Sequence, residues 1–187
     1  MNLRPISALG EYVVFVGKAF QALPRLSRRR NELLIQLQQI TVGSILLITL
    51  TAAFTGMVTA LQAVYQSKGY MPINLLSVLI GKSTMIELAP VLTALVMTGK
   101  VGASMAAEIG TMKVSEQLDA LESMSIKASN FLYMPRILAG MIGFPIITIY
   151  SNLISIRSAW YFAWMKYGIH YHTGFVNMRS YFSPSDL

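Results

Sequence analysis

One uncharged run constrains this chain more than any other feature of its sequence. From Ile40 to Val64 there are 25 residues without a charged side chain. As a helix, at about 1.5 Å per residue, this run is long enough to cross a hydrocarbon core of roughly 30 Å. Charged side chains make up only 12% of the 187 residues, against roughly 25% in soluble domains. We therefore predict a membrane protein whose first span covers residues 40–64.

A second apolar stretch, residues 75–107, is too long for one crossing. It contains two lysines, a glutamate and a proline. These interruptions predict a short segment that ends near Gly81, followed by a span over residues 88–107. The polar side chains of that span are expected to face protein or water, because exposure to hydrocarbon is costly for them.

A third span is predicted over residues 137–165. An uncharged run of 20 residues begins at Ile137, and the aromatic sequence "AWYFAW" that follows it is typical of a membrane interface. A bend is expected at Pro145, which has no backbone N–H to donate. Taken together, the three runs predict an all-α, polytopic membrane protein that forms a single domain over residues 1–187.

The distribution of Lys and Arg predicts the orientation of the spans. With the N-terminus inside, the inner segments 1–39 and 108–136 carry nine Lys and Arg residues, and the outer segments 65–87 and 157–187 carry five. Cytoplasmic loops are normally the more basic ones. The loop between the second and third spans is therefore expected in the cytoplasm.

The residues before the first span predict a membrane-surface element. Residues 6–23 are apolar but too short and too interrupted to span, which fits a helix lying in the interface; a cytosolic cap helix is the alternative. The basic stretch "PRLSRRRN" then fits an anchor near anionic lipid. It lacks the interleaved aromatic residues of a single-strand platform, so no nucleic-acid partner is expected.

The stretch "GTMKVSEQLDALESM", residues 110–124, is unusually polar for this chain. Ser115 is a good N-cap for a short helix, and Glu116 would place a negative charge in its first turn. Val114, Leu118 and Leu121 have the spacing of one helix face. The pattern predicts an amphipathic helix over residues 114–124.

The polar side of this predicted helix is acidic, with Glu116, Asp119 and Glu122 close together. A helix resting on anionic lipid would instead carry Lys or Arg on its polar face. The acidic face therefore indicates a protein partner. A solvated loop helix with no partner explains the composition equally well.

A specific family resemblance appears between residues 87 and 140. The sequence "ELAPVLTALVMTGKVGASMAAEIGTMKVSEQLDALESMSI", followed by "YMPRILAG", resembles the signature region of the MlaE-type permeases. These are membrane subunits of ABC transporters associated with MCE proteins. Weaker similarity extends over nearly the whole chain.

The resemblance implies an architecture, a function and partners. Such permeases are homodimers in the inner membrane with an interfacial N-terminal helix and five spans, and they move phospholipid or related lipids between that membrane and the envelope. The helix at residues 114–124 would be the coupling helix that docks on a cytoplasmic ATPase subunit, and an MCE-domain protein would bind outside. The chain ends at "SPSDL", where the family continues into further spans, so the C-terminal part is expected to be missing.

Several residues of the signature region are candidates for the transport function, each with a simpler alternative. Glu87 fits the lipid pathway, or pairs with Lys82 at the interface. Lys100 fits a contact with a lipid phosphate, or extends its stem to the nearer membrane surface. Glu108 is expected to order the turn into the coupling segment. A ridge of small residues permits close helix packing, within one subunit or across a dimer: Gly102, Ala106 and Gly110.

Candidates for catalysis are nearly absent from the sequence. His170 and His172 lack a third nearby ligand, so no metal site and no cofactor are expected. The sequence "IGKST" at residues 80–84 lacks the first glycine of a phosphate-binding loop, and the chain is not expected to hydrolyse ATP. Two alternatives to a lipid permease remain: a permease for a soluble solute, which needs a polar site deep in the membrane, and a membrane-embedded lipid-modifying enzyme, which needs a cluster of reactive side chains.

Overall fold

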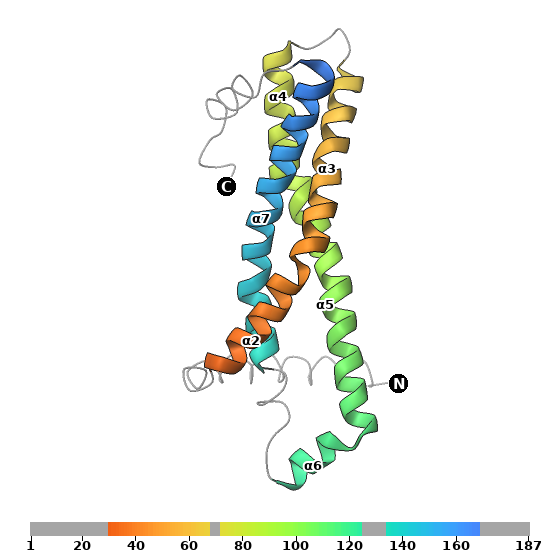
Figure 1. Ribbon diagram of the computed structural model, residues 1–187, viewed down its shortest axis with the longest axis vertical. Helices are drawn as coiled ribbons and strands as arrows, with labels where there is room; N and C mark the ends of the chain where they lie inside the picture. Colours follow the sequence, from red (N-terminus) through yellow and green to blue (C-terminus); the bar gives the residue numbers. More distant parts are fainter. Residues whose placement is uncertain (1–29, 68–71, 125–133, 169–187) are drawn as a thin grey trace, which may run out of the picture. The chain divides into compact units, whose positions relative to one another are not determined.

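The computed structural model describes residues 30–67, 72–124 and 134–168, and these residues contain helices and short turns but no strand (Figure 1). The interfacial helix expected over residues 6–23 and both histidines lie outside the described residues. The elements in chain order are α2 (Arg30–Thr41), the 3-10 helix η2 (Val42–Ser44), α3 (Ile45–Gln66), α4 (Ile73–Lys82), the π-helix η3 (Ser83–Leu88), α5 (Ala89–Val114), α6 (Gln117–Ser123) and α7 (Met134–Tyr167).

Three stretches of the described chain are long and apolar enough to cross a membrane: Arg30–Gln66, Leu75–Val114 and Pro135–Tyr167. Many large apolar side chains on them are exposed, such as Leu46, Leu95 and Ile149. A soluble monomer rarely leaves so much apolar surface in contact with water, whereas hydrocarbon solvates it. The predicted all-α, polytopic membrane architecture is confirmed.

The chain packs as two compact units. Among the described residues, the first comprises residues 30–42, 104–124 and 134–143, and the second comprises residues 43–67, 72–103 and 144–168. In the first unit, Gly143 of α7 lies against α2, where an added Cβ would be 3.4 Å from side-chain carbons of Leu37 and Ile40.

In the second unit, α3, α4 and α7 share one apolar core (Figure 1). Its buried members are Ala60, Leu76, Ile80, Ala159 and Trp160. Trp160 is only 4% exposed, whereas Tyr161 and Trp164 of the same aromatic stretch are exposed. Only part of the sequence "AWYFAW" is therefore available for a membrane interface, because Trp160 fills the interior of the bundle.

A very close helix contact of the second unit lies at Gly56 of α3. A Cβ at this position would overlap the backbone carbonyl oxygen of Ser155 in α7. Beside it, the hydroxyl of Ser158 donates a 2.9 Å hydrogen bond to the carbonyl oxygen of Ala53. The absence of a side chain at Gly56 allows the two backbones to approach, as small residues do between membrane helices.

Hydrogen bonds between hydroxyl groups also join the spans of the second unit. Thr49 and Tyr150 share a hydrogen bond of 2.7 Å, and the hydroxyl of Thr93 donates to Ser151 over 2.7 Å. Such contacts give each polar group a protein partner in place of water. They align α7 with both α3 and α5.

The break expected near Gly81 is not present. The helix continues from α4 through η3 into α5, and the backbone N–H of Ala89 donates to the carbonyl of Thr84, five residues earlier. Pro90 follows directly; a proline has no N–H to donate to the carbonyl four residues before it, and its ring would clash with that carbonyl. A local π-helical register is one way in which a long helix accommodates such a disturbance. The α7 helix likewise continues through Pro145.

Candidate functional site

A sharp turn of two residues lies between the end of α5 and the start of α6 (Figure 1). We call this turn, Ser115 and Glu116, the elbow. The N–H of Ser115 donates to the carbonyl of Thr111 over 3.0 Å, and its hydroxyl donates to the same oxygen over 2.8 Å. Ser115 therefore closes α5 rather than capping the following helix. The expected N-cap role of Ser115 is wrong, because α6 begins only at Gln117 and Glu116 lies between them.

Glu116 changes the direction of the chain at the elbow. Its φ of 56° lies in the left-handed region, where it is the only non-glycine residue among those described. Its N–H donates to the carbonyl of Lys113, and its carbonyl accepts from Ala120 over 3.0 Å. One residue therefore ends α5 and begins α6. Helices commonly end in this conformation, but usually with glycine.

The seven residues of α6 carry the predicted amphipathic pattern in a shorter form. Leu118 and Leu121 are half-buried, whereas Glu116 and Asp119 are exposed. Val114 was expected on the apolar face of this helix, but it is the last residue of α5 and is 87% exposed. The two turn residues of the elbow separate it from α6, so the helical spacing does not extend across them.

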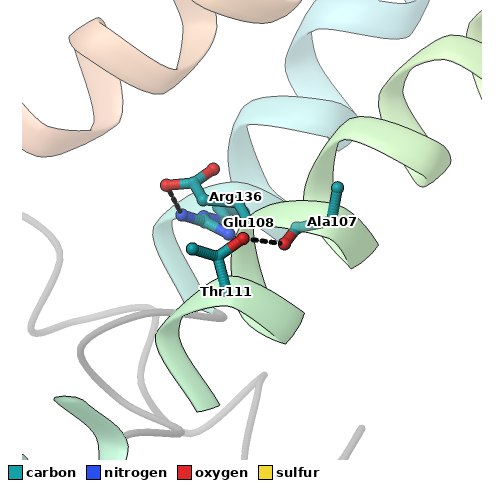
Figure 2. Close-up of polar contacts among 4 residues, drawn as sticks. All are labelled: Ala107, Glu108, Thr111 and Arg136. Atoms are coloured by element: carbon teal, nitrogen blue, oxygen red, sulfur yellow. Dashed lines mark hydrogen bonds and ion pairs between the residues drawn. The ribbon is translucent and has the colours of Figure 1, made fainter. Parts of the chain in front are cut away.

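An ion pair joins α5 to α7 near the elbow (Figure 2). A side-chain nitrogen, Nη2, of Arg136 lies 2.5 Å from Oε1 of Glu108. The arginine side chain is 4% exposed and the glutamate side chain 44%. The other terminal nitrogen of Arg136, Nη1, is buried without a hydrogen-bond partner among the described residues.

The position of Arg136 makes the carboxylate of Glu108 especially important. Arg136 lies in the first turn of α7, behind Pro135, which is well suited to a helix start. A positive charge is unfavourable at a helix N-terminus, and burial adds a desolvation cost. A carboxylate at this place offsets both effects. Glu108 was expected to order the turn into the coupling segment, and no role was predicted for Arg136; an arginine at the start of an apolar segment is the sequence signal that a partner exists.

Lys100 has a role that neither sequence interpretation predicted. Its ammonium group donates to the carbonyl oxygen of Gly43 and, over 3.0 Å, to the hydroxyl of Ser44. Both acceptors belong to the 3-10 helix η2. Lys100 therefore fastens α5 to the residues directly before α3. Glu87 lies in η3, exposed, in the same unit.

The small-residue ridge is exposed along α5. Added Cβ atoms at Gly102 and Gly110 would meet nothing within 4 Å, and Ala106 between them is exposed. Within the described part of the chain, no helix packs on this ridge. The described residues as a whole contain no cluster of three or more His, Cys, Asp or Glu side chains able to hold a metal ion.

Comparison with known proteins links this arrangement to transport. The family model described as Permease MlaE matches residues 33–187. The chain is 36% identical over 162 residues to the intermembrane phospholipid transport system permease protein MlaE of Haemophilus influenzae, covering 81% of this chain and 62% of that protein. It is 29% identical over 186 residues to a probable ABC transporter permease protein of Rickettsia bellii, covering 100% of this chain and 72% of that protein. The chain thus spans less than two thirds of the Haemophilus protein.

Proposed function

Since the chain belongs to the MlaE permease family, we propose that it is the membrane subunit of an ABC transporter that moves phospholipids or related lipids between the inner membrane and the cell envelope. The family is one of transporter permeases, so an enzymatic role is set aside. The name of the Haemophilus relative supports phospholipid as the substrate. Energy would come from a separate ATPase subunit.

The elbow is the observation that carries this proposal. A docking helix for a motor protein needs an exposed surface and a short connection to a span. The seven-residue α6 has half-buried leucines beside exposed carboxylates, and only Ser115 and Glu116 separate it from the 26-residue α5. A force applied to α6 would therefore reach the membrane segment of α5 through two ordered residues. We assign ATPase coupling to the following residues: Ser115, Glu116, Leu118, Asp119, Leu121 and Glu122.

The lipid pathway is proposed to include Glu87 and the neighbourhood of Lys100. Glu87 is exposed within η3, at the one π-helical part of the described chain. An ionisable group in such a segment is costly unless it faces water, lipid headgroups or a partner. Two donors of the Lys100 ammonium are used by the chain, and an ammonium group has three, so one remains for a lipid phosphate.

The composition of the assembly tests the proposal most directly. The protein would be co-expressed with an ABC ATPase and an MCE-domain protein from the same organism, extracted in mild detergent and analysed by mass spectrometry for proteins and lipids. We expect both proteins and enriched phospholipid to remain bound. A preparation that retains the ATPase without phospholipid, and whose ATP hydrolysis responds to a soluble solute, would support the solute permease instead.

The orientation gives a second expected outcome. The distribution of Lys and Arg favours a cytoplasmic N-terminus, and three spans lie before residue 168. A reporter fused at Lys127 should therefore be cytoplasmic, and one fused after His172 should be on the outer side. The opposite labelling would place α6 away from any cytoplasmic ATPase.

The exposed ridge is proposed to contact a second copy of the chain. Gly102→Leu would add bulk where two helices approach and should abolish the dimer seen by cross-linking or native mass spectrometry. Ser104→Leu is the matched control, because at about 100° per residue it lies roughly opposite on the same helix and is also exposed. A dimer that persists in Gly102→Leu would show that the ridge faces lipid.

A further inference from the structure

We propose that the Glu108–Arg136 ion pair is the contact that carries movement of α6 from α5 to α7, which makes both side chains positioning residues for transport. The inference rests on the proposed docking of an ATPase on α6. The two charged groups lie 28 residues apart in the chain and enclose the elbow and α6 between them. The pair therefore ties together the helices on either side of the docking segment.

The α5 side of this connection is ordered without a gap from the ion pair to α6. Glu108 lies six residues before the end of α5 at Val114. The hydroxyl of Thr111 donates to the carbonyl of Ala107 over 2.9 Å (Figure 2). The carbonyl of Thr111 accepts both hydrogen bonds from Ser115. Glu116 then belongs to both helices through its backbone. A displacement of α6 thus moves the carboxylate of Glu108.

The α7 side responds because Arg136 has few alternatives. Its side chain is almost completely buried, and Nη1 has no partner among the residues that the structure describes. A buried guanidinium that loses its carboxylate becomes an uncompensated charge, so Arg136 is expected to follow Glu108 rather than separate from it. The covalent route from α6 to α7 passes instead through residues 125–133. The ion pair is a direct connection between α5 and α7 close to α6.

Such an assignment requires coupling evidence rather than proximity alone. Glu108→Gln keeps the size of the side chain and removes its charge. We would measure three quantities for this variant: ATPase co-purification, ATP hydrolysis, and the phospholipid moved per ATP in vesicles of phosphatidylethanolamine and phosphatidylglycerol carrying a fluorescent phosphatidylethanolamine. We expect ATPase binding within twofold of wild type and a loss of at least tenfold in lipid moved per ATP.

A charge swap and a matched control separate coupling from folding. E108R/R136E restores an ion pair with reversed polarity and should recover most of the lost lipid movement per ATP, whereas R136E alone should not. Thr51→Ala is the control: it removes a hydroxyl-to-carbonyl hydrogen bond that stays within α3, away from the ion pair and α6, and it should keep the wild-type amount of lipid moved per ATP.

The possible failures are distinguishable. Wild-type lipid movement per ATP in Glu108→Gln would overturn the inference while leaving ATPase docking intact. A parallel fall in membrane yield, ATPase binding and hydrolysis, unrepaired by the swap, would overturn it in favour of a purely structural pair. If the wild-type protein retained no ATPase, the proposed function itself would be wrong.

Discussion

Replacing both Glu116 and Asp119 with lysine should release the ATPase subunit while leaving the permease inserted in the membrane. Both side chains are exposed, Glu116 directly before α6 and Asp119 within it. Reversing their charge would place like charges against the basic groups expected on the partner. Like-charge contacts at an interface cost several kcal/mol. Pull-down of the ATPase with the purified permease measures the effect, with lipid-stimulated ATP hydrolysis as the second readout.

Two further changes on the same helix define what this result means. E116D/D119E keeps both charges and should retain the ATPase. Leu121→Ala removes a half-buried side chain and should weaken association by more than about 1 kcal/mol, since buried anchors dominate such interfaces. ATPase binding and hydrolysis at the wild-type level in the double lysine variant would mean that α6 is a solvated loop helix.

Gly56→Ala should destabilise the helix bundle strongly, although it adds a single methyl group. That methyl group would overlap the backbone of Ser155, which cannot rotate away as a side chain can. Overpacking of this kind costs about 1–3 kcal/mol, occasionally more. We expect a lower midpoint of thermal unfolding in detergent and loss of the contact between α3 and α7.

Gly102→Ala is the matched control, and its effect on stability should be opposite in direction to that of Gly56→Ala. No atom lies within 4 Å of a Cβ at this position, and alanine is favoured over glycine in a helix by roughly 0.5–1 kcal/mol. Measured in a detergent that keeps the permease monomeric, this variant should be at least as stable as wild type. Equal destabilisation by both substitutions would contradict the close helix contact at Gly56.

The local features of this chain follow from the sequence alone. Whether a segment enters hydrocarbon depends on the summed transfer free energy of its own residues, so an uncharged run such as residues 40–64 predicts a span without reference to any partner. The amphipathic pattern of Leu118, Asp119 and Leu121 likewise depends only on helical spacing. The all-α architecture and the position of α6 were therefore predictable.

Contacts between helices were not predictable from these rules. The sequence offered Gly102 as a packing position, but the close contact within the chain is at Gly56, and Lys100 and Glu108 have partners 57 and 28 residues away in the chain. Consecutive residues point about 100° apart around a helix. A small rotation therefore changes which side chains meet, and rotation is fixed only when all helices pack together.

The elbow shows the same difference between what the sequence predicts and what only the structure decides, within one short stretch. Its amphipathic composition was visible in the sequence, but the left-handed conformation of Glu116 and the bond from Ser115 to Thr111 were not. Ser115 has the chemistry of an N-cap and a hydroxyl that can equally bond the preceding turn. The sequence determined that a polar helix follows the second span. The tertiary structure decided where α5 ends, because the left-handed conformation of Glu116 turns the chain there, and helices that end in this conformation usually do so with glycine.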